Sequence, residues 1–274
     1  MTPLLISPRL GLLDERAANG HVRHNMWLLE LEGQSSFKAR LVLGFTCLWS
    51  LLFLLAWSAI RLPALKPAAV WDIRNRLVSA AHGTFAYFVA LYALTFWRDF
   101  GLENTPLENF LVSGTLGYFL YDTVCMLSLS LYDSFILVHH LAVVVGLSAS
   151  LLTNMGGAEI TWGYIITEGS NAFLHSKEIT RDLGLKDTKL YLTVELGFFA
   201  TYYFGRFAVG VPGVFWIVTS ATTPLLVKSV AFLLEVQSFE WGYRMQKVMR
   251  KRYAETQQRA IRGITLQWLV PAKV

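Results

Sequence analysis

Charged residues are scarce in this chain of 274 residues, at only 16% against 54% hydrophobic residues. A soluble domain usually carries about 25% charged residues. The apolar residues also come in long blocks, which is typical of chains that cross a bilayer several times. The composition therefore excludes an ordinary soluble domain and indicates an all-α polytopic membrane protein.

Cysteine is rarer still, with only Cys47 and Cys125, both inside apolar blocks. We expect them to pack as small hydrophobic residues rather than to form a disulfide. The six histidines include His21 and His24 near the N-terminus and form no repeated clusters of the kind a membrane di-iron oxidase needs. We therefore predict no metal and no bound cofactor.

The N-terminal residues 1–40 lack the apolar core of a cleavable signal peptide. We expect a non-membrane head here, irregular except for one short interfacial helix near Met26–Leu31. The net charge of +5 comes from basic residues at the two ends and in two loops, without aromatic residues interleaved to stack on bases. We assign this charge to topology and lipid head groups, and we expect no nucleic-acid partner.

Seven apolar blocks are long enough to span a membrane, which takes about 20 residues each. They are Leu41–Leu62, Leu77–Trp97, Leu107–Leu131, Phe135–Leu152, Ala158–His175, Leu190–Val209 and Gly213–Val236. Residues 241–274 form a basic tail, and Glu240–Arg262 alternates basic with aromatic and Met residues. This pattern predicts an amphipathic helix on an anionic leaflet, with a solvated helical tail as the alternative. More basic residues lie on the side of the tail, so the positive-inside rule predicts a cytosolic C-terminus.

Ionisable residues interrupt five of these blocks at a similar depth. With a rise of about 1.5 Å per residue, His82, Asp122, His139, Glu168 and Glu195 each lie roughly 8 to 14 Å from a helix end on the same side. Such residues are costly in hydrocarbon and mark functional sites. We therefore predict that these five side chains meet in one chamber in the cytosolic half of the bilayer.

The adjacent pair His139 and His140 is the leading catalytic candidate. Neighbouring helical residues point about 100° apart, so we expect one imidazole to face the chamber and the other to bond to an adjacent helix. An imidazole suits proton transfer or a transient acyl intermediate, and Asp122 would orient it and fix its tautomer. The alternative is that these polar groups only join helices.

The candidate substrate-binding residues lie on helical faces beside this pair. One face carries a set at i, i+3 and i+7 spacing that would grip a polar head group, namely Glu168, Asn171 and His175. Further candidates share faces on the second and third blocks or stand near a basic surface: Ser79, His82, Tyr118, Arg74 and Arg76. The two arginines would hold a phosphate, or would serve only as topology signals.

Lys228 lies within the seventh apolar block. It admits a retinal-type Schiff base with Asp122 as counter-ion, but that function would leave the histidine pair and the Glu168 face unused. The role of Lys228 stays open.

Several short motifs together resemble the TLC domain family, which comprises the TRAM, Lag and CLN proteins. They are Trp71-Asp72, Arg76-Leu77-Val78-Ser79, His82-Gly83, Leu116-Gly117-Tyr118-Phe119-Leu120-Tyr121-Asp122, Tyr132-Asp133, His139-His140-Leu141, Gly146 and Thr167-Glu168-Gly169-Ser170-Asn171. The resemblance covers residues 70–240 and looks closer to the small TLC domain-containing proteins and the CLN branch than to the ceramide synthases.

The resemblance implies six helices forming a barrel around a central cavity, about seven transmembrane helices in all, with Leu41–Leu62 as the extra helix. It also implies residence in the endoplasmic reticulum or a related endomembrane. In the ceramide synthases the histidine pair moves an acyl group from acyl-CoA, which suggests that role for His139 and His140. The acidic stretch that follows the pair in those enzymes is replaced here by Leu152–Gly157 and the segment Glu168-Gly169-Ser170, so we do not expect ceramide synthesis.

Two functional hypotheses follow, both within membrane lipid homeostasis. In the first, the protein is a histidine-dependent acyl or lipid transferase, with acyl-CoA as co-substrate. In the second, the cavity binds a lipid without catalysis, and the protein regulates membrane composition or escorts cargo. Membrane lipids are the expected partners, with a second copy of the chain or another membrane protein as further candidates. The sequence leaves the acyl donor, the acceptor and the oligomeric state open.

Overall fold

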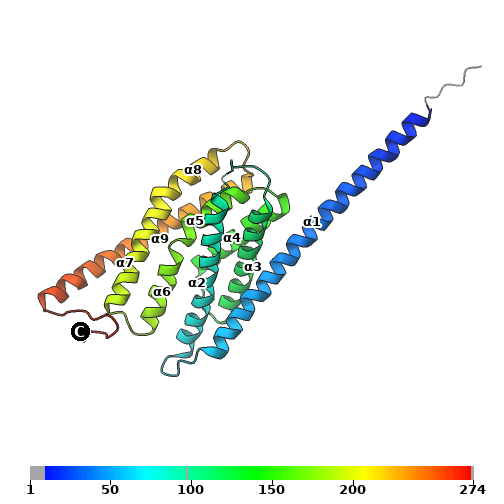
Figure 1. Cartoon of the computed structure of the whole chain (residues 1–274). Coiled ribbons are helices and arrows are strands. Elements are labelled where there is room, and N and C mark those ends of the chain that lie inside the picture. The colour runs from blue at the N-terminus through cyan, green and yellow to red at the C-terminus, as the bar shows by residue number, and fades with distance from the viewer. Residues whose placement is uncertain (1–9, 97, 273–274) are drawn as a thin grey trace, which may run out of the picture.

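The computed structural model describes residues 10–96 and 98–272, with side chains from residue 34 onward. These residues form a bundle of helices without a β-strand, and one long helix extends beyond the bundle (Figure 1). In chain order the helices are α1 (Leu10–Ala59), α2 (Pro67–Leu94), α3 (Pro106–Ser128), α4 (Ser134–Thr153), α5 (Gly157–Glu168), α6 (Asn171–Asp182), α7 (Lys189–Tyr203), the π-helix η1 (Phe204–Gly210), α8 (Val211–Thr219) and α9 (Leu225–Ile261).

Four helical segments have the length and hydropathy needed to cross a membrane: Gln34–Ala59, Pro67–Leu94, Pro106–Ser128 and Ser134–Thr153. They correspond to the first four apolar blocks of the sequence. The protein is therefore an all-α, multi-pass membrane protein, as its composition predicts.

Short polar residues fix where these helices begin. Thr105 caps α3 by accepting from the Glu108 backbone N–H, while the Glu108 side chain accepts from the Thr105 backbone N–H. Asp133 caps α4 by accepting from the backbone N–H groups of Phe135 and Ile136 at 2.8 and 2.9 Å. Such caps satisfy N–H groups that have no partner within their own helix, and they set the height of each helix in the bundle.

The N-terminal head differs from its prediction. The helix α1 is continuous from Leu10 to Ala59, so residues 10–40 are not irregular, and Met26–Leu31 belongs to the long helix. Residues 1–9 lie outside the described part. Leu, Ala, Glu and Arg dominate this stretch and are strong helix formers, whereas an isolated glycine weakens a helix by only about 1 kcal/mol.

The fifth apolar block, Ala158–His175, forms two helices of 12 residues each rather than one. The sixth block continues without a break from α7 through η1 into α8, past Pro212. The connection to α9 is therefore the segment 220–224, not residues 210–212 between the predicted blocks Leu190–Val209 and Gly213–Val236. A π-helical segment shifts the hydrogen-bond pattern, which lets the chain pass a proline without ending the helix.

Helix α9 extends from Leu225 to Ile261 and includes the predicted tail helix. Its far end packs on the start of α7, where Arg252 pairs with Glu195 at 3.1 Å and Arg259 pairs with Asp187. The chain beyond α9 then returns to the same place, with the Lys189 backbone N–H donating to the Gln267 carbonyl at 2.8 Å. The tail is thus fastened to the bundle.

Close packing at small residues joins α1 to α3. A Cβ built at Gly117 would lie 2.7 Å from Phe45 Cβ and 2.9 Å from the Val42 carbonyl oxygen. One turn earlier, the Trp49 indole N–H donates to the Gly114 carbonyl at 3.0 Å. Small residues of this kind let two membrane helices approach closely, and α1 accordingly lies against the outside of the bundle at α3.

Candidate functional site

A cavity of about 650 Å³ occupies the interior of the bundle. Its walls come from every helical segment from α2 to α9, whereas none of the α1 side chains that the structure describes, from residue 34 onward, lines it. Ten of the residues predicted from the sequence line this one cavity: Ser79, His82, Arg76, Tyr118, Asp122, His139, His140, Glu168, Asn171 and His175. The arrangement is that of helices enclosing a chamber, with α1 outside.

His140 is held against α3. Its Nδ1 lies 3.2 Å from the Thr123 hydroxyl, and its Nε2 lies 3.6 Å from Asp122 Oδ2. The Thr123 hydroxyl donates to the Phe119 carbonyl at 2.6 Å, so toward His140 it can only accept, which places a proton on Nδ1. The lone pair of Nε2 would then face a carboxylate. The pair must therefore share a further proton, either as imidazolium with carboxylate or as imidazole with carboxylic acid.

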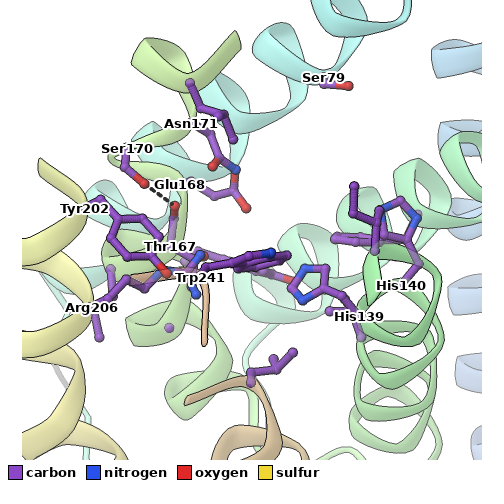
Figure 2. A pocket seen from close by; sticks show the side chains of 18 of the residues that line it. Ser79, His139, His140, Thr167, Glu168, Ser170, Asn171, Tyr202, Arg206 and Trp241 are labelled. Atoms are coloured by element: carbon purple, nitrogen blue, oxygen red, sulfur yellow. Dashed lines mark hydrogen bonds between the residues drawn. The ribbon is translucent and has the colours of Figure 1, made fainter. Parts of the chain in front are cut away.

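His139 is held differently, by α9. Its Nδ1 lies 3.2 Å from the Gln237 amide oxygen, and its ring lies 5.2 Å from the ring of Trp241 (Figure 2). Donation from Nδ1 to Gln237 leaves Nε2 as the basic nitrogen. Within the described part of the chain, Nε2 of His139 makes no hydrogen bond. His139, rather than His140, thus offers a free lone pair in the cavity.

Asp122 belongs to a buried network between α2 and α3. Its two oxygens accept from the Asn75 amide at 2.7 Å and from the Tyr118 hydroxyl at 3.2 Å. The Tyr118 hydroxyl also lies 2.8 Å from the Ser79 hydroxyl. His82 stacks on the Tyr118 ring, with the ring centroids 3.8 Å apart. Asp122 therefore orients His140 while itself held in place, and Ser79 and Tyr118 are already bonded to protein groups.

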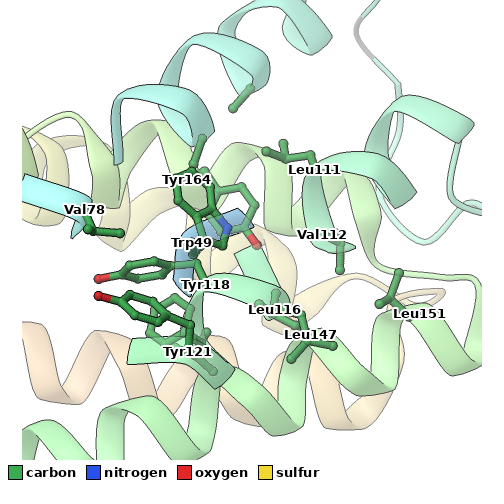
Figure 3. Packing of buried hydrophobic residues seen from close by; sticks show 14 of the residues in the cluster. Trp49, Val78, Leu111, Val112, Leu116, Tyr118, Tyr121, Leu147, Leu151 and Tyr164 are labelled. Carbon is green, nitrogen blue, oxygen red and sulfur yellow. The ribbon is translucent and has the colours of Figure 1, made fainter. Parts of the chain in front are cut away.

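The same residues join the cavity wall to the apolar core. Figure 3 shows Tyr118 and Tyr121 beside Trp49, with Leu116 and Leu147 among the surrounding buried side chains. Tyr118 contacts Trp49 edge to face, with the ring centroids 6.0 Å apart. Because these rings are buried on all sides, the polar network of α2 and α3 has little freedom to rearrange.

Glu168 ends α5, and Asn171 begins α6. The Asn171 amide donates to Glu168 Oε2 at 2.6 Å. The same oxygen would lie only 2.8 Å from a Cβ built at Gly83 of α2, so Gly83 makes room for the carboxylate. His175 lies one turn further along α6, and its Nδ1 is buried without a hydrogen-bond partner. The break at residues 169 and 170 thus keeps the three predicted residues on the cavity wall although the helix is not continuous.

Charged residues gather where α2, α6 and α9 meet the cavity. Arg76 pairs with Asp72 at 2.5 Å, and Lys177 pairs with Glu178 at 2.8 Å. Burial alone would raise the pKa of Glu178, but the positive charges of Lys177, Arg76 and Arg181 hold that pKa below its usual range. The other predicted arginine, Arg74, does not line the cavity. We call the set Asp72, Arg76, Lys177, Glu178 and Arg244 the charged end of the cavity.

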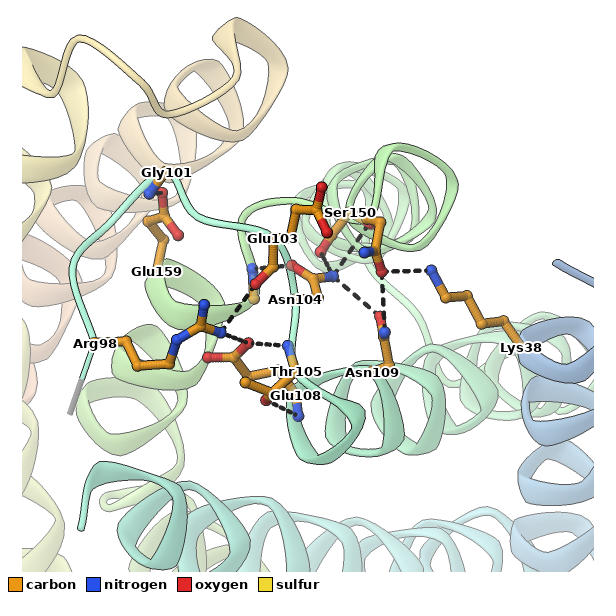
Figure 4. Close-up of polar contacts among 12 residues, drawn as sticks. Lys38, Arg98, Gly101, Glu103, Asn104, Thr105, Glu108, Asn109, Ser150 and Glu159 are labelled. Carbon is orange, nitrogen blue, oxygen red and sulfur yellow. Dashed lines mark hydrogen bonds and ion pairs between the residues drawn. The ribbon is translucent and has the colours of Figure 1, made fainter. Parts of the chain in front are cut away.

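Glu159 of α5 lines the opposite end of the cavity, and Figure 4 shows it beside Gly101. One oxygen of this carboxylate accepts from the Gly101 backbone N–H at 2.8 Å and from the Thr223 hydroxyl at 2.7 Å. Nearby, Lys38 of α1 donates to Asn154 at 2.7 Å, which links α1 to the end of α4. The loops at this end are therefore fastened by polar contacts.

The prediction for Glu195 is wrong, and of the two roles left open for Arg74 the structure does not support phosphate binding. Glu195 does not line the cavity; it is buried between the Tyr191 hydroxyl at 3.0 Å and Arg252 at 3.1 Å. Arg74 donates to the Ile60 carbonyl at 2.6 Å, and its guanidinium lies 4.5 Å from the centre of the Trp57 ring. Arg74 therefore anchors the loop between α1 and α2 rather than a substrate.

The sequence reasoning missed Arg206 of η1 and Glu235 of α9, which both line the cavity. The signal was available, because each is an ionisable residue at or near an apolar block. Lys228 does not line the cavity and donates to the Ser220 carbonyl, so it caps the end of α8.

The described residues contain no cluster of three or more His, Cys, Asp or Glu side chains arranged to hold a metal ion. What the cavity offers instead is a free imidazole nitrogen, a histidine–aspartate pair and further buried polar groups in a largely apolar chamber. Comparison with protein-family models gives a match to the TLC domain over residues 72–239. This match covers the helices that form the cavity and leaves α1 outside. On this match, which spans more than half of its length, the chain belongs to the TLC-domain family.

Proposed function

We propose that the protein acts in membrane lipid homeostasis by taking a lipid into this cavity, and that His139 mediates transfer of an acyl group there. The observation that carries the proposal is the free Nε2 of His139 inside a cavity whose walls are mostly apolar. An imidazole in that state is both a base and an acyl acceptor.

The length of the cavity supports a lipid as its occupant. Val227 and Val248 both line it and lie on the single helix α9. With a rise of about 1.5 Å per residue, they are separated by roughly 30 Å, which is close to the thickness of the hydrocarbon core of a bilayer. The ends differ in charge, with Arg76 and Glu178 at one end and the single carboxylate of Glu159 at the other. An extended amphiphile matches this shape.

The proposed chemistry has two steps. Nε2 of His139 attacks the thioester carbonyl of acyl-CoA; a C–N bond forms, the C–S bond breaks and CoA leaves. A hydroxyl or amino group of the acceptor then attacks the acyl-imidazole, the C–N bond breaks, and the acceptor's proton passes to the released thiolate. Gln237 would keep the imidazole in the reactive tautomer through its contact with Nδ1 at 3.2 Å. The Asp122–His140 pair would supply a polar wall held in place by its own contacts.

The distribution of basic residues supports an orientation in which the charged end of the cavity and the C-terminus face the cytosol. Acyl-CoA would then reach the cavity from the compartment where it is soluble. Family membership supports a place in the endoplasmic reticulum or a related membrane.

The test uses the full chain purified in mild detergent, with His139→Ala compared with wild type. We expect wild-type protein to carry a lipid identifiable by mass spectrometry and, after incubation with radiolabelled acyl-CoA, to yield an acylated lipid. His139→Ala should lower that yield by about 100-fold or more at unchanged protein level. The matched control is His24→Ala, which changes a histidine outside the matched domain.

The second hypothesis, lipid binding without catalysis, is favoured by one observation. Several predicted substrate ligands are already bonded to protein groups, as in the Asn171–Glu168 contact at 2.6 Å and the Tyr118–Ser79 contact at 2.8 Å. In that case wild-type protein would carry a lipid, and His139→Ala would change neither the bound lipid nor the cellular lipid profile. Full acyl transfer by His139→Ala would rule out the catalytic proposal.

A further inference from the structure

Arg206 is a buried cation on the cavity wall. It is 7% exposed and lies in the π-helix η1. One terminal nitrogen, Nη1, donates to the Ser238 hydroxyl at 3.0 Å, and the guanidinium lies 5.6 Å from the centre of the Tyr202 ring. Its Nε is buried without a partner. A guanidinium has five N–H donors, so most of its hydrogen-bonding capacity is unused.

No carboxylate compensates this charge directly. Among the described residues, none of the ion pairs within 4.0 Å includes Arg206. Glu168 and Glu235 are near enough to interact with it electrostatically, but beyond that distance. A buried, unpaired charge within a membrane domain is costly and marks a functional site. Arg206 is therefore placed to bind the anionic group of a ligand.

Glu235 is the complementary case on the neighbouring wall. It is 9% exposed, and its Oε1 is buried without a hydrogen-bond partner. It lies three residues before Ser238 on α9, so it shares a helical face with the residue that Arg206 contacts. The cavity wall therefore carries an unpaired N–H donor, Nε of Arg206, and an unpaired acceptor, Oε1 of Glu235.

These two groups lie at the level of His139. Arg206 bonds to Ser238, and His139 bonds to the preceding residue, Gln237. In Figure 2 the Trp241 ring is drawn between Arg206 and His139. A ligand group held by Arg206 would therefore lie in the same cavity, and beside the same turn of α9, as the free imidazole nitrogen.

We propose that the cavity recognises a lipid whose polar head combines an anionic group, carboxylate or phosphate, with a hydroxyl or amino donor. Arg206 binds the anion and Glu235 accepts from the donor, which is the group that would receive an acyl chain beside His139. The inference rests on the proposed function for its lipid cavity, but binding can be measured without turnover.

The experiment measures binding of four single-chain probes to the full chain in detergent: monooleoyl glycerol phosphate, oleate, monooleoylglycerol and oleylamine. Wild type should bind the phosphate lipid more tightly than the neutral or cationic probe. Arg206→Gln should weaken its binding by about tenfold or more, the usual result of losing a charged hydrogen bond, and leave monooleoylglycerol unchanged. An equal loss for oleate identifies a carboxylate as sufficient, whereas a loss confined to the glycerol phosphate identifies phosphate.

The second arm removes the acceptor. Glu235→Gln should weaken the binding of monooleoyl glycerol phosphate, which carries a free hydroxyl, but not that of oleate, which carries no donor. The matched controls are Glu103→Gln and Arg250→Gln, which change the same residue types at exposed positions outside the cavity. Both controls should bind every probe as wild type does.

Thermal unfolding separates a ligand anchor from a structural arginine. Removing a buried unpaired cation should leave the melting temperature of the ligand-free protein unchanged or raised, while the stabilisation by added phosphate lipid is lost. Arg206→Lys keeps the charge without the fork of donors and serves as a second folded variant, with affinity between those of wild type and Arg206→Gln. A lowered melting temperature with unchanged affinity in either variant overturns the proposal.

The two proposals fail separately. His139→Ala should bind all four probes as wild type does, because its effect is on transfer. If His139→Ala retains transfer, the catalytic proposal is wrong, yet loss of anion binding in Arg206→Gln still supports the anion site. If Arg206→Gln and Arg206→Lys bind the anionic lipids as wild type does, the anion site does not exist.

Discussion

At the scale of single residues, the two adjacent histidines do different work because their neighbours differ. Both ring nitrogens of His140 face α3, one at Thr123 and one at Asp122. His139 has one nitrogen at Gln237 and the other free. Their sequence separation already predicted different directions, but only the packing decides which imidazole remains available. The free nitrogen carries the proposed chemistry, and the bonded pair carries part of the stability.

Asp122 and His139 should contribute unequally to the stability of the protein. Asp122→Asn keeps the shape of the side chain but cannot share a proton with His140 as the carboxyl group does. We expect it to destabilise the protein by about 1 to 3 kcal/mol, the range for a buried polar group left unsatisfied. His139→Ala should change stability far less, because that ring is only partly buried. Thermal unfolding of both variants in detergent checks the order, and equal losses would contradict the assignment.

Gly83 should not tolerate a larger side chain, although it lies within a helix. In a free helix, Gly→Ala stabilises by about 1 kcal/mol. At Gly83 the new Cβ would lie 2.8 Å from Glu168 Oε2 and 3.4 Å from Asn171 Cβ, so we expect Gly83→Ala to lower stability by about 1 to 3 kcal/mol instead. The matched control is Gly44→Ala, since nothing lies within 4 Å of a Cβ built at Gly44. A stabilised Gly83→Ala protein would show that Glu168 does not lie against α2.

At the scale of helices, the register of α7 decides which residue reaches the chamber. Helix α7 begins at Lys189, and its first turns pack on the end of α9, where Glu195 meets Arg252. Arg206 lies roughly 16 Å further along the helical axis and is level with His139 through Ser238 and Gln237. The residue of the sixth apolar block that lines the cavity is therefore Arg206, not Glu195.

This register marks the limit of what the sequence could predict. Hydropathy shows that ionisable groups interrupt the blocks, and that was enough to find Asp122, the histidine pair and Glu168. The depth of Glu195 in the membrane, however, follows only if the apolar block and the helix are level with the other blocks. Helix α7 begins beside the end of α9, so Glu195 lies there and not at the level of the cavity. The continuation through Pro212 was also hidden, because a π-helical turn has no clear pattern in a single sequence. Helix offsets arise from packing between segments far apart in the chain.

The prediction at this scale uses Glu178, which lies beyond the end of the fifth apolar block. Nearby positive charges hold its pKa below the usual value of about 4.3. Its ion pairs therefore stabilise the protein fully above that pH, and the contribution is lost as pH falls through the lowered pKa. We expect Glu178→Gln to melt below wild type at pH 7, with a difference that shrinks only below about pH 4.

Melting temperatures of the two proteins between pH 3 and pH 7 check this sign. Glu240→Gln is the control, because the Glu240–Arg244 pair is exposed and such pairs contribute little. A difference between Glu178→Gln and wild type that disappears already near pH 6 would mean that the charged end of the cavity does not stabilise the ionised form.

At the scale of the molecule, the matched domain and the cavity coincide. The cavity is lined from Asp72 to Val248, while the family match covers residues 72–239. The described side chains of α1 pack on α3 from outside, and none of them lines the cavity. The resemblance implied six helices around a chamber and one extra helix, and the lining agrees with that arrangement. The chamber is thus a property of the domain as a whole.

Whether the chamber must be empty for function can be tested by filling it. Gly163 of α5 lines the cavity, and a Cβ built there meets nothing within 4 Å, so Gly163→Leu should enter the space without clash. Filling a void with apolar atoms leaves the melting temperature unchanged or raises it, while any bound lipid must be displaced. We expect co-purifying lipid to fall by about tenfold or more. Gly44→Leu is the matched control, because Gly44 has the same open surroundings but lies on α1, outside the cavity. If Gly163→Leu retains its lipid while Gly44→Leu loses it, the lipid binds on the outer surface at α1 rather than in the chamber.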